Sequence, residues 1–337
     1  MAHVIELKNV SMAFAVGGGI FGAKKFAKAV DNVNIHIDER QTLALVGESG
    51  CGKTTTGKIV AGLLKPTEGE VLYHGKNIWK MHRKEFNEYR KAVQIIHQDP
   101  YASLNPMLTI YKSLSAPLFK HKIVSTKEEA IDHVSKLLEM VGLTPPEDFI
   151  FKYPHQLSGG QRQRVVIARA ISLNPKIIVA DEPVSMIDVS MRLQILHLMK
   201  DLQQKLGVGY LFITHDLATG RYFASDGYTA VMYLGSIVEF GPTNKVILDP
   251  QHPYTKALLS AIPEPDPEKT RKKKVMKLRS LDVPSLLNVP SGCKFHPRCP
   301  FFIEGKCDKT PPGRYYLEKD RWVACYLYGD GGASESR

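Results

Sequence analysis

The sequence predicts an α/β protein whose core is a parallel sheet with a nucleotide-binding loop at one edge. Three observations support this prediction. A glycine-rich run at 47–54 separates an apolar, strand-like segment at 42–46 from a helix-like segment at 55–64. A second apolar segment, 177–182, ends in two acids. Further apolar and helix-like segments alternate after it, as in proteins whose parallel strands are connected by helices.

The glycine-rich run fits the P-loop pattern without a mismatch. Its glycines let the backbone turn so that N–H groups point at phosphate oxygens, and the following helix N-terminus adds positive potential. We expect Lys53 to reach the β- and γ-phosphates of ATP, and the Thr54 hydroxyl to ligate Mg²⁺. A glycine-rich turn that binds nothing is disfavoured by the strand–loop–helix context. The predicted nucleotide contacts here are Gly47, Glu48, Ser49, Gly50, Cys51, Gly52, Lys53, Thr54 and Thr55.

Two acids, Asp181 and Glu182, end the second apolar strand. Parallel sheets build ligand sites at the carboxyl ends of their strands. Asp181 is therefore predicted to hold Mg²⁺, directly or through a water, and Glu182 to orient or deprotonate the water that attacks the γ-phosphate. Two such acids could instead cap the next helix, but the P-loop upstream favours the catalytic interpretation.

Sequence patterns place several other elements. Amphipathic patterns predict helices at 124–141 and 189–206. The second helix has apolar residues at three-residue spacing, namely Leu193, Leu196, Met199 and Leu202. A buried strand is predicted at 209–214, and a hairpin at 229–240 turning at 234–236.

A second anion-binding turn is predicted where Leu157-Ser-Gly-Gly-Gln161 opens a helix at 161–173. Because the P-loop already serves one set of phosphates, this turn suggests a second nucleotide face. The residues predicted to contact nucleotide there are Ser158, Gly159, Gly160 and Gln161.

With these motifs the sequence resembles the ATP-binding subunits of ABC transporters, whose signature motif contacts the ATP held by the partner subunit. The resemblance implies roles for four more residues, which match family elements in order along 4–240. These are Phe14, which would stack on adenine, Gln98 of the Q-loop, Asp188 of the D-loop and the switch histidine His215. Gln98 and His215 join Glu182 as predicted catalytic residues, and Gln98 is also a predicted Mg²⁺ ligand.

Three further segments narrow the resemblance. Segments 17–22, 101–106 and 249–256 look like the oligopeptide/dipeptide importer subfamily, which has nickel- and oligosaccharide-related members. The glycine insertion at 17–22 looks most like the second of its two ATPase subunits. The resemblance implies ATP hydrolysis that energises import of oligopeptides or dipeptides. Import of short oligosaccharides is one alternative, and a soluble ABC-type ATPase not linked to transport is another.

The resemblance also implies partners. A second ABC ATPase subunit, a paralogue forming a heterodimer, would complete the ATP sandwich. Two transmembrane permease subunits would follow its movements, and an extracytoplasmic solute-binding protein would take part indirectly. Since no apolar run approaches about 18–20 residues and no signal peptide opens the chain, the expected location is peripheral, at the cytoplasmic face of the membrane.

The formal net charge of +11 is concentrated in one basic run at 269–279, after a proline-rich stretch at 263–267. No aromatic residue interleaves with the basic residues to stack on bases, so nucleic acid is not an expected partner. The run is interpreted as a solvated linker, with contact to anionic lipid as the alternative.

Five cysteines are present, and Cys51 belongs to the P-loop. The others form a C-x5-C-x7-C-x17-C pattern, namely Cys293, Cys299, Cys307 and Cys325. In a cytosolic chain such a group points to metal rather than disulfides. Structural zinc prefers C-x2-4-C pairs, so the wide spacing favours a [4Fe–4S] cluster, which some members of the resembled family carry in this tail.

Zinc held by four thiolates, or with His296 replacing one of them, is the second interpretation of the cysteine pattern. Four free structural cysteines are the third. The centre is expected to stabilise the C-terminal region and to contribute little to hydrolysis at Glu182, which is distant along the chain.

The complete fold prediction is a P-loop ABC ATPase core with a β-rich N-terminal part. Residues 76–175 form a helix-rich insertion between the P-loop and the acidic strand, with a helical subdomain at about 100–175. The ATP-binding domain is predicted to span 1–260. A linker and a small irregular cysteine-rich region are predicted at 261–337.

Overall fold

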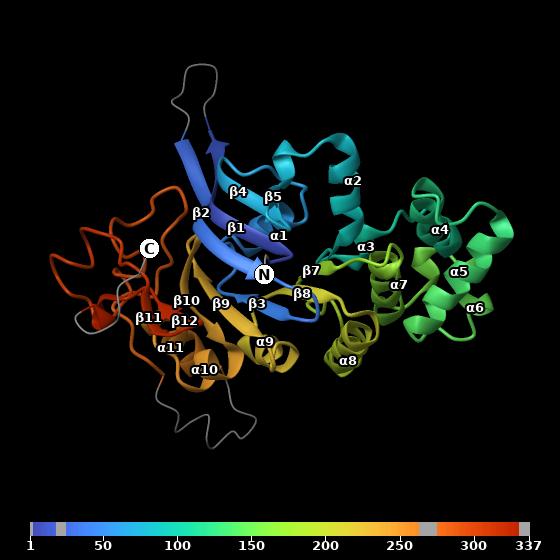
Figure 1. Cartoon of the computed structure of the whole chain (residues 1–337). Helices are drawn as coiled ribbons and strands as arrows, with labels where there is room; N and C mark the ends of the chain where they lie inside the picture. Colours follow the sequence, from blue (N-terminus) through green and yellow to red (C-terminus); the bar gives the residue numbers. More distant parts are fainter. Residues whose placement is uncertain (1–2, 18–24, 263–274, 330–337) are drawn as a thin grey trace.

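The computed structural model describes residues 3–17, 25–262 and 275–329, and their strands form two sheets (Figure 1). A four-stranded antiparallel sheet has the order β2-β1-β4-β5, and an eight-stranded sheet has the order β11-β12-β10-β9-β3-β8-β7-β6. The strands are β1 (Ile5–Val16), β2 (Lys25–Ile37), β3 (Thr42–Val46), β4 (Glu68–Tyr73), β5 (Lys76–Asn77), β6 (Val93–Ile96), β7 (Ile177–Asp181), β8 (Gly209–Thr214), β9 (Tyr228–Tyr233), β10 (Ser236–Pro242), β11 (Tyr315–Glu318) and β12 (Arg321–Val323).

The large sheet has a parallel centre and an antiparallel edge. Strands β9, β3, β8, β7 and β6 run parallel, whereas β10, β12 and β11 are antiparallel to their neighbours. Every residue of β3, β7 and β8 is buried, as expected for parallel strands covered on both faces. The predicted strands at 42–46 and 209–214 and the hairpin turning at 234–236 are confirmed, and the strand predicted at 177–182 is confirmed with its end one residue earlier, at Asp181.

Eleven α-helices and three short 3₁₀ helices lie in the described residues. The α-helices are α1 (Lys53–Val60), α2 (Arg83–Ala92), α3 (Pro100–Ser103), α4 (Ile110–Lys120), α5 (Lys127–Met140), α6 (Glu147–Ile150), α7 (Gly159–Ile171), α8 (Val189–Leu206), α9 (Leu217–Phe223), α10 (Thr243–Leu248) and α11 (Pro253–Ala261). The 3₁₀ helices are η1 (Ile78–Lys80), η2 (Pro154–Gln156) and η3 (Tyr326–Tyr328).

Several helices have different ends from those predicted. Helix α1 begins at Lys53 rather than residue 55, and α7 begins at Gly159 rather than residue 161. In both cases the glycine-containing turn leads directly into the helix. Helix α5 begins only after Thr126, whose side chain accepts a hydrogen bond from the Glu129 backbone N–H at 3.2 Å and caps the first turn.

The buried face of α8 differs from the predicted one. Its ends match, but Leu193 is 56% exposed, whereas Ile195 is fully buried beside Met199 and Leu202. A strict three-residue spacing drifts around a helix with 3.6 residues per turn, so one face needs alternating steps of four and three. The step from Ile195 to Met199 followed by the step to Leu202 satisfies that rule.

Helices α3–α7 form an arm at the end of the molecule opposite the C-terminal region (Figure 1). Apolar side chains from α4, α5 and α7, including Leu114, Val134 and Val165, are fully buried in one cluster that continues to the large sheet. The insertion at 76–175 is not purely helical, because β6 pairs with β7 and adds an edge strand to the large sheet.

The C-terminal region extends the large sheet. Strand β12 pairs with β10 through Glu239–Val323 and Phe240–Trp322, and β11 pairs with β12. The small irregular region predicted here therefore contributes two strands to the ATP-binding sheet, a pairing that the sequence does not predict. The division at residue 260 stays a prediction. No described helix has the length and apolar character needed to cross a membrane.

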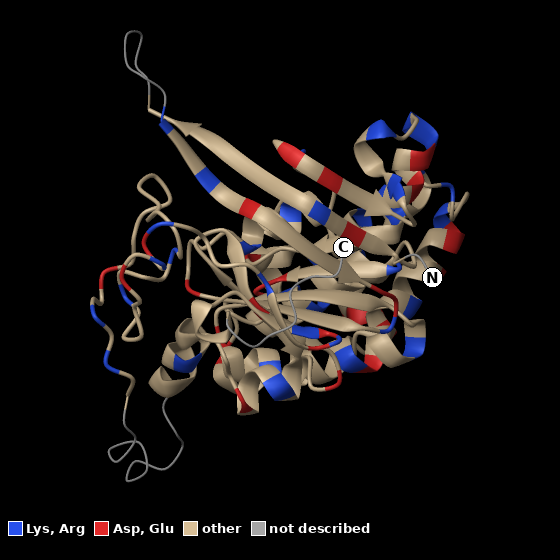
Figure 2. Ribbon diagram, turned by 60° about the vertical axis from the view of Figure 1, so that its left-hand side comes forward, with Lys and Arg blue, Asp and Glu red and all other residues tan. Residues whose placement is uncertain are grey.

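Charged residues of both signs are interspersed over the described ribbon (Figure 2). The glycine insertion at 18–22 and the basic residues at 269–274 lie outside the described residues. Of the basic run, Lys277 and Arg279 are described, and both are exposed.

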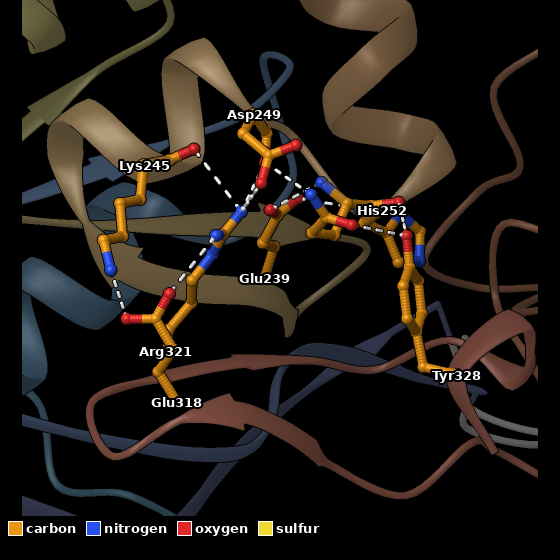
Figure 3. A network of polar contacts seen from close by, with 8 residues as sticks. Glu239, Lys245, Asp249, His252, Glu318, Arg321 and Tyr328 are labelled. Atoms are coloured by element: carbon orange, nitrogen blue, oxygen red, sulfur yellow. Dashed lines mark hydrogen bonds and ion pairs between the residues drawn. The ribbon is translucent and has the colours of Figure 1, made fainter. Parts of the chain in front are cut away.

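A polar network around the buried side chains of Glu239 and Arg321 fixes the C-terminal hairpin (Figure 3). Arg321 of β12 donates to the Asp249 carbonyl oxygen and, at 3.1 Å, to its carboxylate. Glu239 of β10 is fully buried and accepts from the backbone N–H groups of Gln251, at 2.8 Å, and His252, at 2.9 Å. Tyr328 donates to the Gln251 side chain at 2.8 Å. The network therefore joins β10, β12 and the turn between α10 and α11.

We expect Arg321→Ala to lower the free energy of unfolding by about 2–3 kcal/mol, because the carbonyl oxygen and the carboxylate of Asp249 both lose the guanidinium as a donor and Glu239 loses a nearby positive charge. The measurement is urea unfolding of the purified chain. Lys319→Ala, on the exposed turn of the same hairpin, is the control and should stay within about 0.5 kcal/mol. Equal stability of both variants would contradict the role of the network.

Candidate nucleotide site and cysteine-lined cavity

The P-loop connects the end of β3 to α1 and can be built only with glycine at key positions. Gly52 has φ 108°, and a Cβ there would lie 2.0 Å from the Ala29 carbonyl oxygen. A Cβ on Gly47 would lie 2.2 Å from the Met232 carbonyl oxygen. Lys53 is buried, and its Nζ donates to the carbonyl oxygens of Gly47, at 2.8 Å, and Glu48, at 2.9 Å. The Lys53 ammonium group is thus held against the backbone of the P-loop, where both can reach a bound phosphate.

Two of the three predicted Mg²⁺ residues, Thr54 and Asp181, lie together across α1 and β7, whereas Gln98 bonds to Glu182. Thr54 Oγ1 donates to Asp181 Oδ1 at 3.1 Å. Burial raises the pKa of Asp181, while the Thr54 bond opposes that shift and the Glu182 carboxylate adds to it. A divalent cation would favour the ionised carboxylate, and hydroxyl and carboxylate oxygens are ligands that Mg²⁺ accepts. Thr54 and Asp181 therefore fit the ion that the motifs predict.

The three predicted catalytic residues meet at Glu182. Gln98 Nε2 donates to Glu182 Oε2 at 3.0 Å, and His215 Nδ1 lies 3.0 Å from Glu182 Oε1. They come from the segments that follow β6, β7 and β8. The Glu182 side chain is largely buried, whereas His215 is half exposed. Sequence reasoning predicted each residue, and the structure brings all three into contact.

The backbone of Glu182 is held in an unusual conformation. Its φ of 47° is in the left-handed region, which is uncommon for a residue other than glycine. Its N–H donates to the Ile213 carbonyl oxygen at 3.0 Å, and its carbonyl oxygen accepts from the Ser185 hydroxyl at 3.0 Å. These bonds fix the turn after β7 and direct the carboxylate towards Gln98 and His215.

The signature turn caps α7. Ser158 Oγ accepts from the Gln161 backbone N–H at 3.2 Å, and Gln161 Oε1 accepts from the Ser158 N–H at 2.9 Å. The Arg162 guanidinium lies 3.9 Å from the centre of the Tyr101 ring, a contact that sequence reasoning missed. Within the described residues, no hydrogen bond joins 158–161 to the P-loop.

Two predicted nucleotide residues lie apart from these contacts. Phe14 lies on β1 opposite Ala27 of β2, with its side chain partly exposed. Asp188 is exposed just before α8, and its side chain makes no capping bond to that helix. Neither contacts the P-loop through a hydrogen bond or ring interaction found in the described residues.

The four C-terminal cysteines line one small cavity. Cys293, Cys299, Cys307 and Cys325 surround it together with His252 and His296, and the lining is almost entirely apolar. Cys299, Cys307 and Cys325 are buried. His252 is fully buried, and its Nδ1 accepts from the Tyr254 N–H at 3.0 Å. The cavity thus gathers thiol and imidazole groups, which are ligand types that zinc and iron–sulfur centres take.

Raised pKa values keep these thiols protonated unless a cation stabilises the thiolate form. Burial raises the pKa of Cys293 to about 12 and that of Cys325 to about 11, and neighbouring cysteines add to both shifts. The backbone N–H two residues further on bonds to the sulfur of Cys293, Cys299 and Cys325 and favours its ionised form. Hydrogen bonds of this kind are common at metal–thiolate centres, so the residues fit such a group.

The sulfurs are not gathered as closely as one tetrahedral ion requires. Among the described residues, the one set of three ligand atoms mutually within 4.8 Å is His3, His36 and Asp38, far along the chain from the cysteines. In that set, His3 already forms a 2.8 Å ion pair with Asp38 and stacks on His36. No three of the four cysteine sulfurs therefore lie mutually within 4.8 Å in the described residues.

Comparison with known proteins agrees with this geometry. Residues 30–185 match the model of the ABC transporter family, and residues 238–307 match the oligopeptide/dipeptide transporter C-terminal region. The chain is 44% identical over 332 residues to the putative oligopeptide transport ATP-binding protein YkfD of Bacillus subtilis, covering 98% of each. It is 42% identical over 313 residues to the oligopeptide transport ATP-binding protein OppF of Salmonella typhimurium, covering 92% of each.

A solved structure is also similar. The dimeric ATP-binding cassette MJ0796, in a post-hydrolysis state bound to ADP and Pi, aligns with a TM-score of 0.62 and 32% identity, covering 71% of this chain and 98% of that one. The fold and the site therefore define an ABC-type ATPase. The chain belongs to the ABC transporter family of ATP-binding proteins, and it carries the C-terminal region of the oligopeptide/dipeptide branch.

We expect Glu182→Gln to keep ATP binding but to slow hydrolysis by about 10²–10⁴-fold, because the amide cannot accept the proton of the attacking water. Steady-state ATPase activity and equilibrium ATP binding are measured in the assembled transporter. Glu88→Gln, an exposed acid on α2, is the control and should hydrolyse at the unmodified rate. Unchanged turnover in Glu182→Gln would remove this residue from the reaction.

Proposed function

We propose that the chain is the ATP-hydrolysing subunit of an importer of oligopeptides or dipeptides. The observation that supports this cargo best is the match of residues 238–307 to the oligopeptide/dipeptide transporter C-terminal region, joined to an ABC cassette in one chain. Relatives named for oligopeptide or dipeptide transport are similar over nearly the whole length. Import of short oligosaccharides is the alternative cargo.

The residues around Glu182 would carry hydrolysis. Glu182 orients and deprotonates the attacking water, while His215 and Gln98 hold its carboxylate from two sides, each at 3.0 Å. Lys53 and the P-loop N–H groups bind the phosphates. Mg²⁺ would be held by Thr54 and Asp181, with Gln98 as the third predicted ligand, and would neutralise charge on the phosphate oxygens. Phe14 would stack on adenine.

A second ATPase subunit would complete the site. Ser158 to Gln161 present a helix N-terminus, and within the described residues they make no hydrogen bond to the chain's own P-loop. That arrangement supports contact in trans, with each ATP between one P-loop and the partner's signature turn and Asp188 close to the shared surface. A paralogous partner would make the pair a heterodimer.

The helical arm would receive the permease subunits. Large apolar side chains, among them Tyr101, Met107 and Phe151, are exposed along it. Tyr101 follows Gln98 closely, so movement of the arm can reach Glu182 through the Q-loop. This arrangement supports a peripheral location at the cytoplasmic face of the membrane, with two permease subunits and, indirectly, a solute-binding protein as partners.

The cysteine-lined cavity would hold a [4Fe–4S] cluster. A tetrahedral Zn²⁺ with Zn–S bonds of about 2.3 Å places its sulfurs about 3.8 Å apart. No three of these cysteine sulfurs lie mutually within 4.8 Å in the described residues, which favours a larger centre. Cys293, Cys299, Cys307 and Cys325 all line this one small cavity. Zinc remains the alternative.

Cargo is tested by reconstituting the chain with its own ATPase, permease and binding-protein partners in liposomes. ATP should drive uptake of a labelled tripeptide, and the complex with Glu182→Gln should take up less than about a hundredth as much, as its slowed hydrolysis requires. A labelled trisaccharide is the control solute. ATP-driven uptake of the trisaccharide without the tripeptide would replace the proposed cargo.

The cluster is tested on anaerobically purified protein. It should be brown, absorb broadly near ~400 nm and contain about four irons per chain. Cys299→Ser should bleach the colour and expose the region after residue 275 to protease, whereas Cys51→Ser, outside the cavity, should keep the iron. One zinc and no iron would contradict the cluster and support zinc, and no metal would contradict both.

A further inference from the structure

The segment from Cys293 to Cys299 contacts both the cysteine-lined cavity and the nucleotide-binding part of the molecule. The cysteines at either end line the cavity. Between them, Lys294 forms a 2.7 Å ion pair with Asp31 and donates at 2.7 Å to the carbonyl oxygen of Leu234, in the turn between β9 and β10. This turn also contacts the P-loop, since the Gly235 N–H donates to the Cys51 carbonyl oxygen at 2.8 Å. The segment is thus attached directly to the nucleotide half of the molecule.

Arg298, the residue before Cys299, binds the P-loop itself. Its Nη1 lies 2.9 Å from Glu48 Oε2, and its Nη2 lies 3.1 Å from Glu48 Oε1. Glu48 is the second residue of the loop. Such a two-point pairing fixes both the position and the orientation of a carboxylate. The Arg298 side chain is 7% exposed and that of Glu48 is 27% exposed, so water screens the pair only in part.

The C-terminal half also holds the backbone of Glu48. The Glu48 N–H donates to Tyr254 Oη of α11 at 2.9 Å. Phe295 packs against Tyr254 and Tyr233, with ring centres 5.4 Å and 5.3 Å apart. The Arg298 guanidinium lies near the Tyr233 and Phe295 rings, at 5.8 Å and 5.7 Å. The aromatic group therefore keeps Arg298 and Tyr254 in fixed places on either side of Glu48.

We propose that Arg298 is a positioning residue for the nucleotide site and that it carries the state of the cysteine-lined cavity to the P-loop. The loop binds phosphates through backbone N–H groups, so its affinity depends on its shape. Arg298 adjoins Cys299, so a change at that sulfur displaces the guanidinium that holds Glu48. The transmission from the cavity rests on the proposed metal centre. The pairing of Arg298 with Glu48 does not depend on what the cavity holds.

The first test measures the Kd of a fluorescent ATP analogue, with KM and kcat, in the assembled transporter. Arg298→Ala should raise Kd and KM about five- to tenfold, as expected for losing one charge-assisted pair. The kcat should change less than about twofold, because the contacts of Glu182 are untouched. Arg298→Lys should recover only part of the affinity, since lysine cannot pair at two points. Arg314→Ala, whose guanidinium lies 4.8 Å from the Trp322 ring, is the matched control and should bind normally.

The variant Glu48→Gln tests the same ion pair by removing the carboxylate on the P-loop side. It should weaken binding by a similar factor, and the double variant Arg298→Ala/Glu48→Gln should bind no more weakly than either single variant. Normal affinity in the double variant would assign the loss to an unpaired Glu48 charge and overturn the positioning role. Normal affinity in both single variants would overturn it as well. Should Arg298→Ala not fold, Arg298→Lys and Glu48→Gln decide the question.

The second test addresses transmission. Cys299→Ser should raise the Kd in the unmodified chain, but should add less than about twofold when Arg298 is already alanine, because paired changes along one route are not additive. No effect of Cys299→Ser on Kd, or an equal effect in both backgrounds, would overturn transmission through Arg298. Iron and zinc are measured in the same samples, so absence of metal would contradict the proposed cluster separately from the Kd comparison.

Discussion

The nucleotide site depends on three buried parallel strands that end at the same edge. Strands β3, β7 and β8 pair in register, with Val46 opposite Thr214 and Asp181 opposite Ile213. All their residues are buried, so polar side chains that need access to ligand are placed mainly where the strands stop. The P-loop, the acidic pair and the switch histidine follow three strand ends and therefore converge on one point.

Local sequence signals predict this part of the molecule well. The three central strands and both ends of α8 follow from short apolar runs and amphipathic spacing, which are properties of neighbouring residues. The predicted first residue of a helix is wrong where the helix follows a glycine-rich turn. Gly52 and Gly159 suggest loop, yet α1 starts just after the first and α7 starts at the second, because a glycine-rich anion-binding turn continues directly into its helix.

Contacts between distant segments could not be predicted in the same way. Arg298 and Glu48 are separated by 250 positions. Nothing in the sequence around Arg298 distinguishes it from an ordinary exposed arginine. Strand β12 has only three residues and is defined by its pairing with β10, so its own sequence is too short to predict it. The sequence groups the four cysteines along the chain, but the cavity that they line is completed by His252 and Pro253 at the start of α11, a contact that becomes visible only after folding.

Two separate anchors bring the cysteines together. Cys325 follows β12, whose neighbour Ala324 donates its N–H to the Val238 carbonyl oxygen of β10 at 2.8 Å. Cys293 and Cys299 are placed by Lys294, Phe295 and Arg298 against the P-loop side. A spacer of two residues, as in common zinc pairs, would be too short to supply these three docking contacts. The wide spacing thus has a physical reason of its own, because the residues between the cysteines dock against the P-loop side. It lets one segment form part of the wall of the cavity and contact the P-loop at the same time.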